Sequence, residues 1–145
     1  MYKRILVPLD GSKTAEGVLP HTKALAYSEG AEIILLTVAA NPTMDYVFSD
    51  PGLAERAIQE QQTRSKKYMT EMENELKAAG FKVSSLLREG AVADLILRVA
   101  EELQVDVITM STHGRTGPAR WLLGSVADRV VRNSKVPVLL IRAKG

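Results

Sequence analysis

Residues 81–110 read FKVSSLLREGAVADLILRVAEELQVDVITM and contain two apolar segments on either side of a regular helical pattern. Between these segments, apolar residues recur at the i, i+3, i+4 and i+7 spacing of one helix face: Val92, Leu95, Ile96, Val99, Ala100 and Leu103. Residues 81–87 and 105–110 are short and apolar, as buried strands are. A strand, a helix and a second strand in succession favour parallel pairing through a right-handed crossover. This stretch therefore predicts an α/β fold.

The same alternation extends to both ends of the chain. Further strands are predicted over residues 3–8, 33–38 and 136–142, and further helices over about 15–29, 53–79 and 125–133. Residues 39–52 are expected to form a polar loop. The element order predicts a single domain over residues 1–145 with an open, mainly parallel five-stranded sheet, covered by helices on both faces in a Rossmann-like arrangement.

The amino-acid composition limits the kinds of functional site that the chain can form. The chain has 145 residues, of which 46% are hydrophobic and 25% charged, as in a globular domain. The absence of cysteine excludes disulfide frameworks, thiolate metal sites and cysteine nucleophiles. The longest apolar runs have about six residues, against about 20 for a membrane helix, and the first residues lack a signal-peptide pattern. We therefore expect a cytoplasmic protein with no membrane partner.

Charge is distributed unevenly along the sequence. Residues 1–110 carry 12 Lys and Arg against 16 Asp and Glu, a balance of −4, whereas residues 111–145 carry seven against one, a balance of +6. A basic final quarter suits an anionic partner such as a phosphate-bearing small molecule or a nucleic acid. It is equally consistent with a solvated face that balances the acidic remainder. Because the basic segment has no aromatic platform, nucleic-acid binding is not favoured.

Two loops that follow predicted strands have unusual composition. Open α/β sheets bind ligands at the carboxyl ends of their strands, where the strand order reverses. Residues 8–12 (PLDGS) follow the first strand, and residues 110–117 (MSTHGRTG) follow the fourth. A reversal of strand order between these two strands would place the loops across one crevice.

The second loop has the composition of a phosphate site. Gly114, Gly117 and Gly124 allow close backbone approach to an anion, and hydroxyl residues alternate with them. The spacing of Ser125 and Asp128 matches a capping box, which predicts a helix that starts at Ser125 and offers free N–H groups. The alternative is that Ser125 only caps the helix and Gly117 only turns the chain. The glycine fingerprints of P-loop and dinucleotide-binding proteins are both absent.

Several motifs together resemble the universal stress protein family over essentially the whole chain. These are the V-P-x-D-G-S stretch from Val7 to Ser12, the strand ending LLTV at Val38, MSTHGRTG from Met110, WLLGSV from Trp121 to Val126, and the terminal VPVLLIR. The resemblance implies the fold of adenine nucleotide alpha hydrolases. The family's nucleotide-binding members carry Gly, two residues, Gly, nine residues, Gly, then Ser or Thr. Gly114, Gly124 and Ser125 match this pattern, and Ser111 stands at its first glycine.

The resemblance assigns roles to the matching positions. It implies that Pro8, Val38 and Met110 form apolar walls around adenine, and that Asp10 reads the ribose or the adenine edge. It implies a phosphate cradle formed by Gly114, Arg115, Gly124, Ser125 and Val126, and it makes Ser111 a further nucleotide-binding position. Pro8 and Val38 could instead be ordinary core residues, and Asp10 could cap the first helix. The implied ligand is ATP or AMP, with any Mg²⁺ held on the phosphates and waters rather than by the protein.

The last predicted strand suggests an interface. Pro137 cannot donate to a strand ladder, which favours an edge position, and an apolar edge tends to pair with another chain. The resemblance also implies a homodimer around this strand, through Val136, Val138, Leu139, Leu140 and Ile141. The leading hypothesis is a dimeric ATP- or AMP-binding regulator of a stress response, acting on an unidentified regulatory protein. The alternatives are a slow ATPase or phosphoryl-transfer enzyme, for which no base is evident, and a dimeric scaffold that binds no nucleotide.

Overall fold

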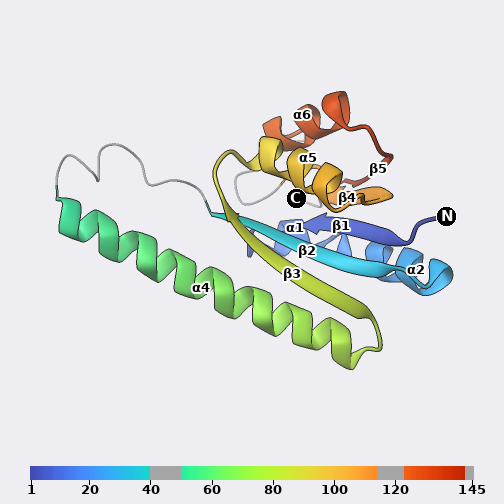
Figure 1. Cartoon of the computed structure of the whole chain (residues 1–145), viewed down its shortest axis with the longest axis horizontal. Coiled ribbons are helices and arrows are strands. Elements are labelled where there is room, and N and C mark those ends of the chain that lie inside the picture. The colour runs from blue at the N-terminus through green and yellow to red at the C-terminus, as the bar shows by residue number, and fades with distance from the viewer. Residues whose placement is uncertain (40–49, 114–122, 143–145) are drawn as a thin grey trace.

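Five parallel strands form one sheet in the order β3-β2-β1-β4-β5 (Figure 1). The computed structural model describes residues 1–39, 50–113 and 123–142. The strands are β1 (Arg4–Pro8), β2 (Glu32–Ala39), β3 (Lys82–Glu89), β4 (Val107–Ser111) and β5 (Val138–Ile141). Strand order runs outward from β1 to β3 on one side and from β4 to β5 on the other, so it reverses between β1 and β4. The predicted fold class is therefore confirmed.

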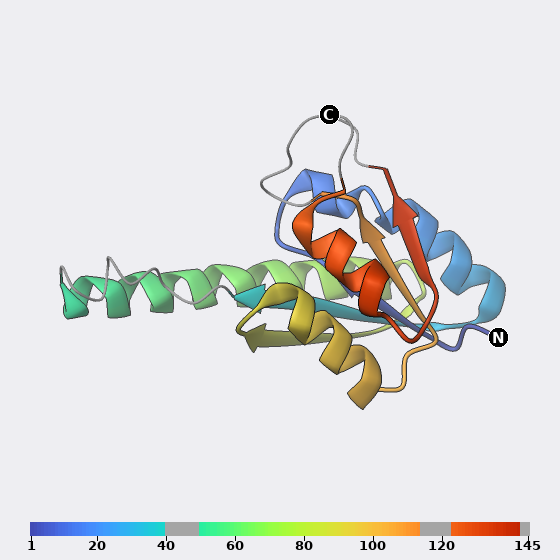
Figure 2. The same ribbon diagram turned by 90° about the horizontal axis from the view of Figure 1, so that it is seen from above.

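The described helices follow the predicted order closely. They are α1 (Lys13–Glu16), α2 (Leu19–Glu29), α4 (Pro51–Ala78), α5 (Val92–Glu102) and α6 (Ser125–Asn133). Helices α1, α2 and α4 lie on one face of the sheet, and α5 and α6 lie on the other (Figure 2). None of the described helices is both long and apolar enough to cross a membrane.

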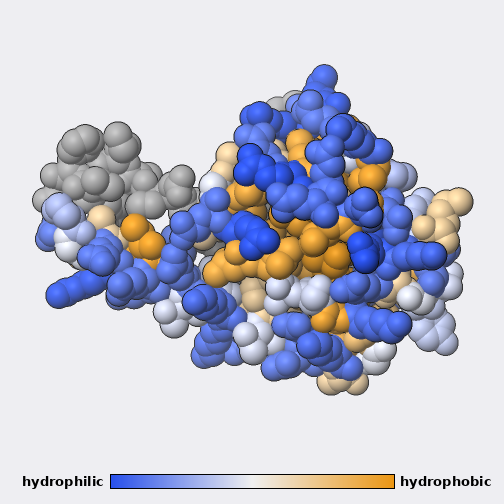
Figure 3. Space-filling view, viewed as in Figure 1, coloured by the Kyte–Doolittle hydropathy of each residue, from blue (hydrophilic) through white to orange (hydrophobic). Residues whose placement is uncertain are grey.

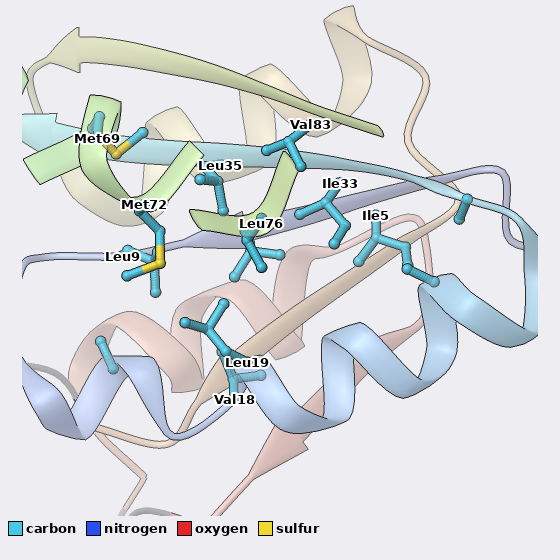
Figure 4. Close-up of a cluster of buried hydrophobic side chains, with 14 of the residues drawn as sticks. Ile5, Leu9, Val18, Leu19, Ile33, Leu35, Met69, Met72, Leu76 and Val83 are labelled. Atoms are coloured by element: carbon cyan, nitrogen blue, oxygen red, sulfur yellow. The ribbon is translucent and has the colours of Figure 1, made fainter. Parts of the chain in front are cut away.

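Each face of the sheet has its own apolar cluster. On the first face, Val18 and Leu19 at the start of α2 approach Leu76 of α4 beneath the strands (Figure 4). On the second face, Ile96 of α5 and Val130 of α6 are fully buried against the sheet. The central strands therefore bury side chains on both sides, which explains their continuous apolar runs. Apolar surface remains visible beside α5, over β2 and β3 (Figure 3).

The single first helix predicted over residues 15–29 is wrong: the structure breaks it into α1 and α2. Gly17 and Val18 form tight i→i−3 hydrogen bonds to Thr14 and Ala15 at 3.2 and 3.5 Å. Pro20, in the first turn of α2, has no N–H to continue the ladder to Glu16. Proline therefore ends one helix and fits the start of the next.

Helix α2 is fixed to β4 by a buried polar contact. The Oγ1 atoms of Thr22 and Thr109 lie 2.7 Å apart, and both residues are 0% exposed. Thr22 Oγ1 also donates to the carbonyl of Val18 at 3.1 Å, so Thr109 supplies the proton of the shared contact. Both hydroxyls are thus satisfied inside an apolar layer.

Helix α4 starts two residues before its predicted start at residue 53. The side chain of Asp50 accepts hydrogen bonds from the N–H groups of Gly52 and Leu53, at 3.0 and 3.3 Å, and Pro51 occupies the first helical position. This Asp-Pro pair is a strong N-terminal signal that the apolar pattern alone does not contain. The helix has 28 residues, and its first half extends beyond the sheet (Figure 1).

Candidate functional site

The carboxyl ends of three neighbouring strands create the candidate site. In the order β2-β1-β4, these ends carry Val38, Pro8 and Met110. Met110 is 5% exposed, while Pro8 and Val38 are half-buried. The structure therefore brings the three predicted apolar walls to one edge of the sheet, at the reversal of strand order. This is the usual place for a ligand in an open α/β sheet.

Asp10 lies in the turn between β1 and α1, at the same edge. Gly11 has φ 87°, a left-handed conformation that favours glycine. The turn lets Asp10 Oδ1 accept from both the N–H and the hydroxyl of Ser12, at 2.9 and 2.5 Å. Ser12 Oγ in turn accepts from the N–H of Ala15 at 3.1 Å and caps α1. Ser12, and not Asp10, is therefore the cap of this helix.

Gly124 packs tightly against the segment that follows β4. Its N–H donates to the Thr112 carbonyl at 2.9 Å. A Cβ atom at this position would lie 2.7 Å from that carbonyl oxygen and 3.1 Å from His113 Nδ1. No residue other than glycine fits without a shift of the backbone. This close approach fixes the start of α6 beside the end of β4.

The predicted start of α6 at Ser125 is confirmed, but the predicted capping box is wrong, because the side chain of Ser125 does not cap the helix. Gly124 is the N-cap of α6, its carbonyl accepts from the N–H of Asp128 at 2.9 Å, and no side chain caps the helix. The hydrogen bond to Thr112 satisfies only the N–H of Gly124 itself, and the N–H groups of the first turn receive no side-chain cap. Ser125 is instead an exposed residue of the first turn, where backbone N–H groups lack helical partners.

His113 contributes a buried polar atom beside this turn. Its Nδ1 atom is shielded from solvent and, within the described ranges, has no hydrogen-bond partner. A buried polar atom without a partner is unusual in a native structure and commonly marks a place that a ligand or water fills. The sequence shows a histidine here but not that its Nδ1 atom is shielded from solvent beside Gly124.

Most predicted site residues thus gather at one edge. Pro8, Asp10, Val38, Met110, Ser111, Gly124, Ser125 and Val126 all lie at the carboxyl ends of strands or in the segments that follow them. Gly114 and Arg115 lie outside the described residues. The predicted interface residues lie on β5 at the edge of the sheet, with Val136 just before this strand.

A contact that sequence analysis missed joins this edge to α4. Tyr68 Oη donates to Glu16 Oε2 at 3.0 Å, which links α4 to α1. Burial of the phenol raises the pKa of Tyr68 well above its ordinary value, and the hydrogen bond and charge of Glu16 add to this effect. In the sequence, Tyr68 is indistinguishable from an ordinary member of the apolar stripe of α4.

The basic final quarter is largely neutralised where the structure describes it. Arg129 pairs with Asp94 at 2.8 Å, Arg132 with Asp128 at 3.0 Å, and Lys135 with Glu101 at 2.6 Å. The first and third pairs link α6 and the segment after it to α5. Ion pairing with the acidic remainder accounts for Arg129 and Lys135, whereas Arg132 pairs with the one acidic residue of the basic quarter itself.

The described residues contain no group of three or more His, Cys, Asp or Glu side chains that could hold a metal ion. The arrangement instead offers apolar strand ends, a carboxylate and an uncapped helix N-terminus. Together these suit a ligand with an apolar planar part, hydrogen-bond donors and an anionic group.

Comparison with known proteins agrees with this arrangement. The model of the universal stress protein family matches residues 1–142. The universal stress protein MJ0577 of Methanocaldococcus jannaschii is 36% identical, over 99% of this chain and 97% of its own length. The solved structure of MJ0577 superposes with a TM-score of 0.88 over 100% of this chain and 99% of the other.

Two solved relatives contain a nucleotide. A universal stress protein in complex with cAMP has a TM-score of 0.73 at 24% identity, covering 99% of this chain and 98% of the other. A family protein from Arabidopsis thaliana with AMP bound has a TM-score of 0.72 at 15% identity, covering 99% and 93%. At these identities the two share the fold with this chain. The family match over residues 1–142 and the 36% identity to MJ0577 place the chain in the universal stress protein family.

Proposed function

We propose that this protein is a homodimeric, adenine-nucleotide-binding module that regulates a stress response, with ATP or AMP as its ligand. Nucleotide occupancy changes its affinity for a regulatory protein rather than feeding a metabolic reaction. The family supports a stress-related role, and relatives of the same fold have been solved with cAMP and AMP.

The close approach of Gly124 to Thr112 is the observation that carries the nucleotide proposal. It sets the open first turn of α6 beside the end of β4, with the exposed Ser125 hydroxyl in that turn. Backbone N–H groups at a helix N-terminus suit a phosphate. Gly114 and Arg115, which precede this turn in the sequence, are proposed to complete the cradle.

The remaining parts of the ligand follow from the same edge. The base would pack between Pro8, Val38 and Met110. The Asp10 carboxylate would accept a hydrogen bond from the ribose or from the adenine edge. Ser111 is 8% exposed at the end of β4, so its small side chain adds little bulk at the position of the family's first glycine. Any Mg²⁺ would be held by the nucleotide phosphates and by water.

The dimer is proposed to form through β5. This strand is an edge of the sheet, and Leu139 at its centre is 39% exposed. Antiparallel pairing with the same strand of a second copy would satisfy both backbone edges and cover the apolar side chains. The other residues proposed for this interface are Val136, Val138, Leu140 and Ile141.

Equilibrium dialysis with labelled ATP and AMP, with and without Mg²⁺, tests the nucleotide proposal. GTP serves as the competitor that separates adenine recognition from phosphate binding. We expect saturable adenine-nucleotide binding that Gly124→Ala weakens at least about tenfold, because the added Cβ displaces the start of α6.

Gly52→Ala is the matched control. A Cβ atom at Gly52 would lie 3.5 Å from Asp50 Oδ1, an ordinary contact, at the start of a helix on the opposite face of the sheet. Its nucleotide affinity should equal that of the wild type. If the wild type binds neither nucleotide, the function is that of a nucleotide-free scaffold. If bound ATP is turned over and the turnover disappears in Gly124→Ala, the protein is a slow ATPase.

A further inference from the structure

We propose that Tyr68 of α4 is a positioning residue that orients Asp10 toward the nucleotide, acting through Glu16 and the short helix α1. The inference rests on the proposed function and extends it to a residue outside the crevice. It is carried by a continuous set of hydrogen bonds, from α4 to α1 and from α1 to the Asp10 turn.

Helix α1 cannot hold its own position. It has four residues, about one turn, and an isolated turn is unstable because nucleation fixes several dihedral angles for one hydrogen bond. Its placement therefore depends on contacts with other elements. Ala15 provides one of them, being 6% exposed in the apolar cluster, and Glu16 provides another through Tyr68.

The Asp10 turn is attached directly to this helix. The Ser12 hydroxyl donates to Asp10 Oδ1 at 2.5 Å and accepts from the N–H of Ala15 at 3.1 Å. A displacement of α1 thus moves Ser12 and with it the carboxylate that Ser12 holds. The length of the connection is short: Asp10 and Glu16 are six positions apart in the sequence, with α1 between them.

Electrostatics explain why a phenol suits this position. The negative charges of Glu16, Asp10 and Glu75 all contribute to the raised pKa of Tyr68, so three carboxylates lie within electrostatic reach of its hydroxyl. The nearest cation of α1, Lys13, has its Nζ 3.7 Å from Glu16 and a side chain that is 96% exposed, so solvent screens it. Tyr68 offers a neutral, half-buried donor that fixes Glu16 without adding charge near Asp10.

Removal of the phenolic hydroxyl should therefore change recognition more than folding. Phenylalanine retains the ring that packs against the core cluster. Glu16 then loses its donor on α4, and α1 loses this hydrogen bond to α4. The Asp10 carboxylate should then be less well aligned with the group of the nucleoside that donates a hydrogen bond to it.

The experiment compares the affinities of the full-length protein for three nucleotides by calorimetric titration. ATP is compared with 2′-deoxyATP, which lacks one ribose hydroxyl, and with ITP, which lacks the exocyclic amine. We expect the wild type to prefer ATP over at least one of the two analogues. Tyr68→Phe should reduce this preference about threefold to tenfold, and the affinity for the discriminated analogue should change less than about twofold.

Three variants bracket the result. Glu16→Ala should reproduce Tyr68→Phe, and the double variant should lose no more preference than either single variant, because both remove one interaction. Glu16→Gln keeps an acceptor oxygen for the phenol and should restore most of the preference. Tyr27→Phe is the matched control, because Tyr27 lies on α2 with 85% of its surface exposed.

The outcomes separate the inference from the function on which it rests. If Tyr68→Phe reduced the affinity for all three nucleotides equally, Tyr68 would have a general structural role. This result would overturn the inference alone. An unchanged preference would do the same. A wild type that binds ATP and both analogues with equal affinity would show that Asp10 recognises neither the ribose hydroxyl nor the exocyclic amine. Failure of the wild type to bind any adenine nucleotide would instead overturn the proposed function.

Discussion

The two edge strands of the sheet, β3 and β5, differ in length and in charge. β3 has eight residues, starts with Lys82 and ends with Arg88 and Glu89, all three exposed. β5 has four residues, all apolar. Because exposed charges discourage edge-to-edge pairing, β3 is protected and β5 is open to a partner. The proposed dimer therefore uses the edge that lacks such charges.

Self-pairing of β3 is also opposed by the positions of its charges. In an antiparallel pair centred on Ser85, Lys82 of each copy would lie opposite Arg88 of the other. Like charges directly opposite each other are destabilising. An equivalent pair centred on Leu139 of β5 places only apolar residues of the strand opposite one another. This contrast supports the proposal that β5 forms the dimer.

The largest expected effect is loss of the dimer when β5 acquires a charge. Leu139→Lys should shift the protein to monomer, raising the dimer dissociation constant at least about tenfold, because each interface contains two copies of the substitution. Sedimentation velocity over a concentration series measures this. Leu139 is chosen because Val138 and Leu140 are half-buried against the α5 and α6 face, where a charge would also destabilise the fold.

An exposed site on the other edge provides the control for this change. Glu89→Lys introduces a lysine at the exposed end of β3, where it adds to the positive charge that opposes self-pairing, and should leave the association state unchanged. A wild-type protein that is monomeric at all concentrations, or a Leu139→Lys variant that remains dimeric, would refute the β5 interface.

A gain of association is expected when β3 loses its charges. The double substitution Lys82→Val and Arg88→Val removes both basic residues that oppose self-pairing, and should produce oligomers larger than the dimer. Light scattering during storage at constant concentration gives the measurement. The same experiment on Lys67→Val with Lys77→Val, at exposed positions of α4, controls for the change in net charge. If both double variants remain dispersed, charge is not what protects β3.

A smaller effect concerns the anchorage of β3 to α4. Ser85 donates to Glu73 Oε2 at 2.9 Å, and Lys77 lies 3.0 Å from the same carboxylate. These contacts hold the pKa of Glu73 below its ordinary value. A carboxylate with a lowered folded pKa stabilises the fold above its unfolded pKa and loses this contribution as pH falls through the folded pKa.

Glu73→Gln should therefore lower the free energy of unfolding at pH 7 by a few tenths of a kcal/mol. The difference from the wild type should shrink as pH falls through the folded pKa of Glu73, and should be smaller at pH 3 than at pH 7. Urea unfolding at the two pH values measures it, with Glu71→Gln as the control at a more exposed carboxylate whose nearest lysine nitrogen is 4.0 Å away. A difference that persists unchanged at pH 3 would contradict the role of the ionised carboxylate.

The sequence is sufficient for the fold because periodicity and element order are local properties. The apolar repeat of residues 92–103 corresponds to α5, and the run over residues 33–38 corresponds to β2. Failures occurred where a single residue overrides the pattern. Pro20 divides the first helix, and Asp50 with Pro51 starts α4 earlier than its apolar stripe.

The candidate site was predictable in outline and not in its contacts. Strand ends and glycine spacing indicated one edge of the sheet, and the structure brings the described residues of the candidate site to that edge. The cap of α6 was missed because Gly124 is held by Thr112, a contact between segments that are not adjacent in sequence. The hydrogen bond of Tyr68 was missed for a similar reason, since its partner Glu16 lies 52 positions away.

The hydroxyl contact between Thr22 and Thr109 selects among alternative packings of α2. Within this helix the buried residues are Leu19, Thr22 and Ala26, so apolar contact alone distinguishes poorly between neighbouring rotations of the helix. Any rotation or slip would leave the Thr109 hydroxyl without this partner in the interior, at a cost of about 1–3 kcal/mol. The pair therefore mainly destabilises packings in which α2 is rotated or shifted from its native position. This widens the energy gap between the native arrangement and these alternatives.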